Sequence, residues 1–305
     1  MNSYKRREFL KLGSGLLAGL AIAPMACNSS ADTEKTASDS TGAAGTAEAA
    51  ALTAFGLQLY TLRDDFPKDP KGVLKQVAEM GYTQVEGFER DQGVFWGMTN
   101  TEFKSYLDSI GLTMVSSHCD TTKDFEKKAA EAAAIGMKYL IYPWEGADKT
   151  LDDYKKMGDE FNKKGEICKQ NGLRFAFHNH AFSFKQIDGQ YPQDVMMQYS
   201  DPSLVDFEMD IYWVVAAGAD PETWLKKYAN RFKLCHVKDR SKTPVADDGE
   251  NSVDLGTGSI DYTKLLKTAK ENGMEYYIVE QEAYPNGTPL EAAKVDAAYM
   301  KTLKF

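Results

Sequence analysis

The chain has 305 residues, of which 43% are hydrophobic, and its formal net charge is −9. This apolar fraction is enough to form a hydrophobic core, and the negative charge argues against a nucleic-acid polyanion as partner. Beyond Cys27 the cysteines are Cys119, Cys168 and Cys235, an odd number without close spacing. That pattern excludes a disulfide framework and a zinc knuckle, and favours small buried thiols.

The first 27 residues predict a twin-arginine export signal. A basic start containing Arg6 and Arg7 precedes an apolar stretch, residues 16–23, that is too short to span a bilayer permanently. Cys27 follows small residues, as the lipid-attachment cysteine of bacterial lipoproteins does. We therefore expect a periplasmic lipoprotein anchored at Cys27; the alternative is a plain secretory signal cleaved near Ala26. Removing residues 1–26 takes away four basic residues and one acidic residue, so the mature charge is near −12.

Residues 28–51 contain Ser, Thr, Ala, Gly and charged residues but no aromatic residue, so they are predicted to form a disordered tether. The remaining residues, 52–305, are predicted to form one catalytic domain. Their length of about 250 residues is typical of an α/β barrel with eight strands.

Strands and helices are predicted to alternate along this domain. Five helical patterns end at a glycine followed by an apolar residue that opens a strand, as a left-handed helix C-cap requires: Gly81, Gly111, Gly136, Gly172 and Gly273. The predicted strands are 55–60, 83–88, 112–118, 139–143, 173–178, 204–210, 232–237 and 276–281. Helices are predicted between them, for instance at 69–80, 124–135, 151–171, 221–229, 262–272 and 290–300. Eight such units favour a closed (β/α)8 TIM barrel over an open doubly wound sheet, because no Gly-x-Gly-x-x-Gly follows the first strand.

All four histidines lie at the carboxyl ends of predicted strands: His118, His178, His180 and His236. In a TIM barrel these ends form the rim where catalysis takes place, and Asp210 and Glu280 end two further strands. Imidazoles and carboxylates that converge in this way suggest a divalent metal, with His180, Asp210, His236 and Glu280 as ligands. Mixed nitrogen and oxygen ligands suit Mn²⁺, Zn²⁺, Fe²⁺ or Co²⁺. The alternatives are that each histidine is only hydrogen-bonded and that Asp210 only caps the next helix.

Other polar and aromatic residues near the strand ends are candidates for binding a carbohydrate, because a sugar ring stacks on aromatic faces and its hydroxyls form hydrogen bonds. The candidate substrate-binding residues are Gln58, Tyr60, Glu86, Trp96, His118, Trp144 and Arg240. For Trp96 and Trp144 the alternative is ordinary packing between loops. Lys238 is a candidate for stabilising a developing oxyanion, unless it is only a solvated charge. The acidic, glycine-rich segment 247–258 is predicted to be a mobile loop over the site.

The chain resembles the xylose isomerase-like TIM barrel superfamily, and within it the sugar phosphate isomerase/epimerase family proteins. The resemblance spans residues 55–303 and depends on seven motifs, at residues 56–63, 177–180, 209–213, 217–221, 236–239, 256–261 and 279–281. It implies a metal, often manganese, held by Asp210, His236 and Glu280. Epimerases of this superfamily supply a glutamate from strand five, near Ala176, and some relatives have one at the position of Ser183. This chain has neither, so His180 is the substitute ligand, and His178, Glu145 or Glu282 would act as acid or base.

The resemblance and the predicted site suggest an enzyme that removes a proton next to the carbonyl of a non-phosphorylated or oxidised sugar. Isomerisation or epimerisation is the leading expectation, and elimination by a keto-glycoside lyase or dehydratase is the alternative. A non-catalytic carbohydrate-binding lipoprotein is a further alternative. An apurinic endonuclease is disfavoured by the negative charge, and a glycosidase would not explain the placement of the histidines.

Overall fold

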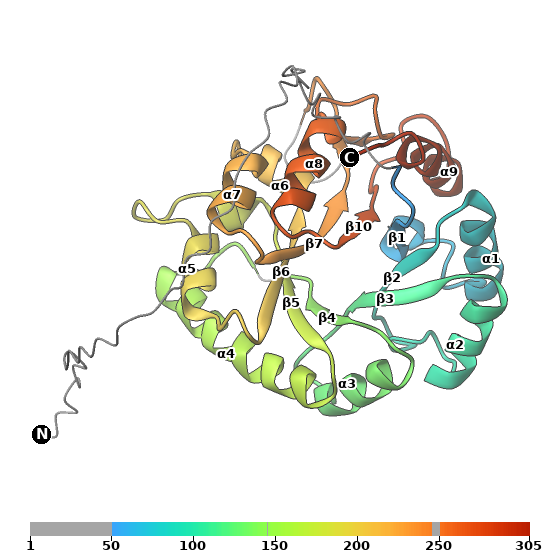
Figure 1. Cartoon of the computed structure of the whole chain (residues 1–305), viewed down its shortest axis with the longest axis horizontal. Helices are drawn as coiled ribbons and strands as arrows, with labels where there is room; N and C mark the ends of the chain where they lie inside the picture. The colour runs from blue at the N-terminus through green and yellow to red at the C-terminus, as the bar shows by residue number, and fades with distance from the viewer. Residues whose placement is uncertain (1–50, 145, 246–250) are drawn as a thin grey trace, which may run out of the picture. The chain divides into compact units, whose positions relative to one another are not determined.

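The computed structural model describes residues 51–144, 146–245 and 251–305 (Figure 1). The predicted export signal with Cys27, the tether as far as residue 50, Glu145 and residues 247–250 of the predicted loop lie outside the described residues. Within the described ranges no helix is both long and apolar enough to cross a membrane.

Eight parallel strands form a closed barrel with helices around it (Figure 1). Its strands, in chain order, are β1 (Gly56–Gln58), β2 (Gln84–Phe88), β3 (Thr113–His118), β4 (Tyr139–Tyr142), β5 (Arg174–His178), β6 (Val205–Asp210), β7 (Phe232–Val237) and β10 (Tyr276–Val279). Each strand pairs with its neighbour in chain order, and β1 closes the barrel on β10. The predicted TIM barrel and its eight strands are thus confirmed. β1 is shorter than predicted because residues 59–62 form a 3-10 helix, η1 (Leu59–Leu62).

Most helices begin at a residue whose side chain caps the first turn, and several end at a glycine with a left-handed backbone conformation. Thr99, Thr150 and Thr288 each form a reciprocal capping box with an acidic residue three positions later. The five predicted glycine caps all have a positive φ, between 75° and 96°. The helices are α1 (Pro70–Met80), α2 (Asn100–Ser109), α3 (Phe125–Ala134), α4 (Leu151–Gln170), α5 (Pro192–Tyr199), α6 (Ile211–Ala216), α7 (Pro221–Lys227), α8 (Tyr262–Glu271) and α9 (Pro289–Met300), with a second 3-10 helix, η2 (Ala181–Phe184).

The barrel interior is apolar only in part. A small buried cluster, Tyr139, Ile141, Ala176 and Leu234, packs inside it, while the main core consists largely of side chains shared by strands and helices. Polar side chains therefore occupy the interior near the carboxyl ends of the strands, where the predicted site lies.

A short antiparallel hairpin, β8 (Asp239–Arg240) with β9 (Ser252–Val253), was not predicted. The Ser252 hydroxyl accepts hydrogen bonds from the backbone N–H groups of Glu282 (3.1 Å) and Ala283 (2.8 Å). The Asp239 carboxylate accepts three more, from Gly256, Gly258 and Ile260. The described part of the predicted loop, residues 251–258, is thus hydrogen-bonded to Asp239 and to the chain that follows Glu280.

Candidate metal centre and substrate cavity

Strand β6 carries three acidic residues at every second position, Asp206, Glu208 and Asp210. Side chains two residues apart in a strand point to the same face, and on β6 that face is the barrel interior. Asp206 accepts a hydrogen bond from Tyr139 in the interior cluster, whereas Glu208 and Asp210 lie successively nearer the carboxyl end. In the pairing of strands, Asp210 lies opposite His236 of β7. The alternation of side chains along β6 and its register with β7 thus place carboxylates and imidazoles at the same depth in the barrel.

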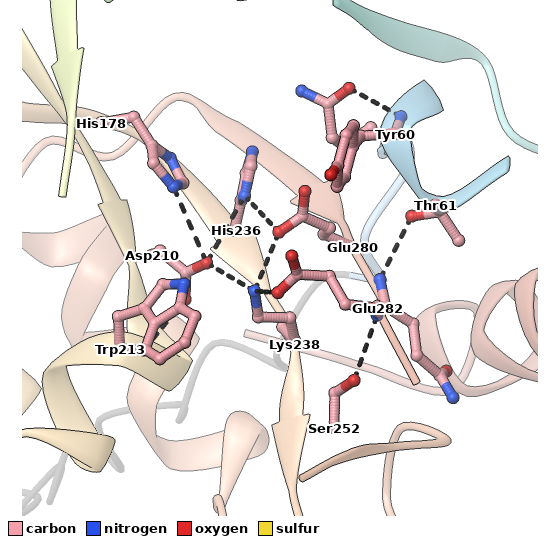
Figure 2. Close-up of polar contacts among 12 residues, drawn as sticks. Tyr60, Thr61, His178, Asp210, Trp213, His236, Lys238, Ser252, Glu280 and Glu282 are labelled. Atoms are coloured by element: carbon pink, nitrogen blue, oxygen red, sulfur yellow. Dashed lines mark hydrogen bonds and ion pairs between the residues drawn. The ribbon is translucent and has the colours of Figure 1, made fainter. Parts of the chain in front are cut away.

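Asp210, His236 and Glu280 form a compact group at the carboxyl ends of β6, β7 and β10, visible in Figure 2. The Nδ1 atom of His236 lies 3.6 Å from Oδ2 of Asp210 and 3.2 Å from Oε2 of Glu280. One potential ligand atom from each of the three lies within 4.8 Å of the others, and all three side chains are buried. We call these three residues the upper group.

The contacts of Asp210 show why the sequence allowed two interpretations of this residue, as a metal ligand and as a helix cap. Its Oδ1 atom accepts the backbone N–H of Trp213 at 3.1 Å and so caps α6. Its Oδ2 atom is buried and has no hydrogen-bond partner in the described structure, although the ammonium of Lys238 lies 3.0 Å away. An unsatisfied carboxylate oxygen beside an imidazole nitrogen and a second carboxylate fits a divalent cation such as Mn²⁺ or Zn²⁺.

His178, rather than His180, faces the upper group from strand five. Its Nε2 atom is 3.9 Å from Oδ2 of Asp210, and its Nδ1 atom is 3.0 Å from Oε2 of Glu208. Burial and the neighbouring imidazoles hold the pKa of His178 well below its usual value, so its ring is neutral, as a metal ligand must be. His178 therefore occupies the place that the sequence assigned to His180.

The chain turns away from strand geometry immediately after His178. β5 ends there, and His180 is already the residue before η2, so the period-two rule does not extend to it. The His180 ring instead packs edge-on against Trp144, with ring centroids 4.5 Å apart, and its Nδ1 atom is buried without a hydrogen bond. Two sets of residues in the described chain bring possible metal ligands together, the upper group and the set His118, His178, Glu208 and His236, and neither includes His180. Between the two histidines, the Asn179 amide pairs with the backbone of Asp210.

Two carboxylates beneath the upper group form hydrogen bonds to the histidine rings. Oε1 of Glu86 lies 2.7 Å from Nε2 of His236, and Oε2 of Glu208 lies 2.8 Å from Nε2 of His118. Gln58 and Ser116 donate to Glu86 at 2.7 and 2.6 Å. We call Glu86, His118 and Glu208 the lower group.

Protonation in the lower group follows from burial and proximity. Burial would raise the pKa of Glu86, but the His118 and His236 imidazoles lower it overall. Burial and the Glu86 charge raise the pKa of Glu208 to about 7. Burial opposes a charge on His118, but Glu86 and Glu208 raise its pKa to about 9. A metal-bound histidine usually donates its other N–H to a carboxylate, which is how His236 meets Glu86 and His178 meets Glu208.

Lys238 places an ammonium ion among three carboxylates. Its Nζ atom lies 3.0 Å from Asp210, 2.9 Å from Glu280 and 2.7 Å from Glu282, as Figure 2 shows. Burial alone would lower the pKa of Lys238, but these carboxylates raise it well above its usual value. Lys238 is fully buried, whereas the side chain of Glu282 is 25% exposed. Lys238 is thus a fixed positive charge beside the upper group.

A cavity of about 800 Å³ opens above these residues. Seven of the predicted site residues line it: Tyr60, His118, Trp144, His178, His180, Glu280 and Glu282. Five more lie buried beneath it: Gln58, Glu86, Asp210, His236 and Lys238. Trp96 does not line the cavity but packs on Phe66 and Phe88 in the core, which agrees with the alternative that it serves ordinary packing. Arg240 does not line it either; it lies in β8 with its guanidinium 6.0 Å from the Tyr212 ring.

Two residues of the site, Glu208 and Asn179, were not predicted from the sequence. The signal for Glu208 was present, because it lies two residues before Asp210 in a strand whose alternate positions are acidic. No local pattern marks Asn179, whose contact with Asp210 joins β5 to β6.

Residues 74–303 match the family described as the xylose isomerase-like TIM barrel. The chain belongs to this family. Among solved structures, a sugar phosphate isomerase/epimerase from Parabacteroides distasonis ATCC 8503 is 30% identical, with a TM-score of 0.68 over 85% of this chain and 96% of that one. The IOLI protein with a bound zinc atom is 14% identical, with a TM-score of 0.65 over 80% of this chain and 95% of that one, which shows the shared fold alone.

Among curated proteins, an inosose dehydratase from Clostridium perfringens is 29% identical over 164 residues, which are 49% of this chain and 54% of that protein. The chain thus spans about half the length of this relative. An inosose dehydratase from Clostridium botulinum strain Alaska E43 is 24% identical over 81% of this chain and 85% of its own length. The relatives therefore include both isomerase/epimerase and dehydratase names.

Proposed function

We propose that this protein is a metal-dependent enzyme that removes a proton from the carbon next to the carbonyl of a non-phosphorylated keto sugar. The observation that carries the proposal is the upper group beside Lys238. Asp210, His236 and Glu280, with His178 facing them, would hold the metal, and a bound divalent metal would act as a Lewis acid toward a carbonyl and an adjacent hydroxyl.

The protein's own residues supply the remaining steps. Lys238 lies buried beneath the cavity beside the upper group, and its fixed positive charge would help to stabilise negative charge that develops on the substrate oxygen. Glu280 and Glu282 of this cluster both line the cavity, but Glu280 would hold the metal, which leaves Glu282 free to transfer a proton. Burial raises the pKa of Glu282, although Lys238 opposes the shift. We therefore assign proton transfer to Glu282. Glu145, the other predicted acid or base, lies outside the described residues.

The cavity lining supports a substrate without a phosphate group. The described lining contains four carboxylates, Glu89, Asp120, Glu280 and Glu282, against three cationic groups, Arg90, Lys185 and the imidazole of His118, whose pKa is raised to about 9. An acidic lining repels a dianion. The predicted export of the chain supports the same choice, because sugar phosphates are expected inside the cell.

Elimination is the second candidate outcome. Strand five lacks the glutamate that a paired acid and base would need, and His178 is held neutral by burial. A single carboxylate can remove a proton and return it to a departing oxygen, which yields an unsaturated product without a second base. The inosose dehydratase relatives favour this outcome.

The test is incubation with Mn²⁺ and a panel of aldoses, ketoses and 3-keto-glycosides in deuterated water. Deuterium at a carbon next to the carbonyl supports the proposal; an isomer identifies isomerisation, and an unsaturated product identifies elimination. In the enzyme, Asp210→Ala should abolish exchange. In a non-catalytic carbohydrate binder, the same substitution should leave sugar binding intact. No exchange with any substrate would overturn the enzyme proposal and favour the binder.

A further inference from the structure

The cavity has an inner and an outer aromatic wall. In Figure 2, Tyr60 and Trp213 stand on opposite sides of the charged cluster, and the ammonium of Lys238 lies 5.1 Å from the Trp213 ring centroid. Trp144 lies nearer the solvent, since its side chain is 55% exposed and that of Trp213 is 7% exposed, with the His180 ring in contact with both. A sugar ring bound at the upper group would meet the inner wall and leave Trp144 uncovered.

Trp144 is exposed to a degree that packing does not explain. Its side chain is 55% exposed, although His180 and Phe182 hold it edge-on at interplanar angles of 87° and 88°. A single exposed aromatic residue on an open surface needs no explanation. This one lines the cavity with its orientation fixed by two rings, so its face is prepared for a partner.

The size of the cavity is consistent with two rings. Its volume of about 800 Å³ lies in the upper part of the range of roughly 300–1,000 Å³ that holds drug-sized ligands. A single sugar ring at the metal would leave the outer space to water. On the Tyr60 side of the cavity the guanidinium of Arg90 lies 5.8 Å from the Tyr60 ring and 5.6 Å from the Phe88 ring.

We propose that the face of Trp144 is an outer subsite that stacks a second ring joined to the sugar. The substrate is then a glycoside, and its second ring is either another sugar or an aromatic group. Both present a flat face that an indole can stack against. This inference rests on the proposed function, since it extends the substrate of the same site.

The test compares matched glycosides that differ only in the outer group. The 3-keto forms of methyl, phenyl and cellobiosyl-type β-glucosides, and of the corresponding galactosides, are titrated calorimetrically into the full chain loaded with Mn²⁺ and carrying Glu282→Gln, which should bind them without proton transfer. An aromatic contact of about 0.5–1.5 kcal/mol corresponds to roughly 2- to 12-fold tighter binding of the ligands with two rings. Trp144→Ala should remove this advantage without weakening the methyl glycoside, whereas Trp144→Phe should retain part of it.

The control is Tyr199→Ala, which removes an aromatic side chain that is 39% exposed and lies outside the cavity. It should change neither affinity. Equal affinity for ligands with one and two rings, or an advantage that survives in Trp144→Ala, would overturn the outer subsite alone. Failure of every glycoside to bind would count against both the subsite and the proposed sugar substrate. Preference for the phenyl over the disaccharide ligand, or the reverse, identifies which second ring the subsite accepts.

Discussion

The Nε2 atom of His236 lies 2.7 Å from Oε1 of Glu86, although the two residues are 150 positions apart and belong to β7 and β2. This contact crosses the barrel and leaves Nδ1 of His236 facing Asp210 and Glu280. In a neutral ring that donates from Nε2 to Glu86, the lone pair lies on Nδ1, which is then the nitrogen available to a metal.

Glu86→Gln should weaken metal binding about 10- to 100-fold, the usual effect of removing a carboxylate that orients a ligating histidine. The amide keeps the size of the side chain but no longer attracts the His236 proton as strongly. Metal competition titration with a chelating dye measures the change. Glu89→Gln is the matched control, since Glu89 pairs with Lys128 instead; equal losses in both variants would remove the role given to Glu86.

His178→Ala should lose bound metal, whereas His180→Ala should retain it. The reason is that Nε2 of His178 faces Asp210, while the His180 ring packs against Trp144. Elemental analysis of the purified variants after dialysis gives the metal content directly. The opposite result would restore the ligand assignment predicted from the sequence.

Lys238→Met should lower turnover about 100-fold or more while metal remains bound, because one fixed charge at a developing oxyanion typically contributes that much. The variant also leaves three carboxylates without their ammonium partner, which costs about 3–5 kcal/mol in comparable buried pairs. Steady-state kinetics and thermal melts are therefore measured at saturating Mn²⁺, which offsets the lost charge. Lys264→Met, whose side chain is 70% exposed, is the control. Unchanged kcat in Lys238→Met would exclude the electrostatic role.

Asp296→Asn should stabilise the protein at alkaline pH. Asp296 on α9 is fully buried, accepts the N–H of Leu255, and has one oxygen without a partner. Burial raises its pKa to about 8, and Asp254 and Asp239 add to the shift. An acid whose pKa is raised by folding stabilises the protein at low pH, and this contribution is lost as pH rises from about 4 to about 8.

The asparagine stays neutral, so the variant should exceed the wild type by on the order of 2–4 kcal/mol at pH 8.5, since one pKa unit corresponds to about 1.4 kcal/mol. At pH 5 the two proteins should differ little. Urea unfolding at both pH values measures the difference, and a difference that is the same at both would contradict the prediction.

The sequence predicted the barrel well because its signals are local. Glycine caps and runs of apolar residues depend on neighbours a few positions away, and every end of the eight strands was placed within two residues of its observed position. The upper group was also brought together as expected, because Asp210, His236 and Glu280 all end strands. His180 was harder to place, since whether β5 continues beyond His178 depends on the Asn179 contact with β6.

The contacts beneath the metal site could not be read from sequence for the same reason. Glu86 was assigned to substrate, yet it lies under His236 because β2 and β7 face each other across the interior. Burial at that depth follows from barrel closure rather than from any pattern around residue 86.

The pairing of β1 with β10, which closes the barrel, has a consequence for how the protein folds. It is registered by only two residue pairs, Gly56 with Ile278 and Leu57 with Val279. The ligand strands β5, β6, β7 and β10 are neighbours in the sheet, whereas Glu86 of β2 and His118 of β3 reach them from across the interior. A chain whose barrel is still open would therefore offer an ion its ligands without the carboxylate that supports His236. An ion that binds only the closed form should slow its opening and shift the equilibrium toward closure. Metal uptake in a refolding experiment should therefore follow the last, long-range step of assembly rather than the early formation of helices.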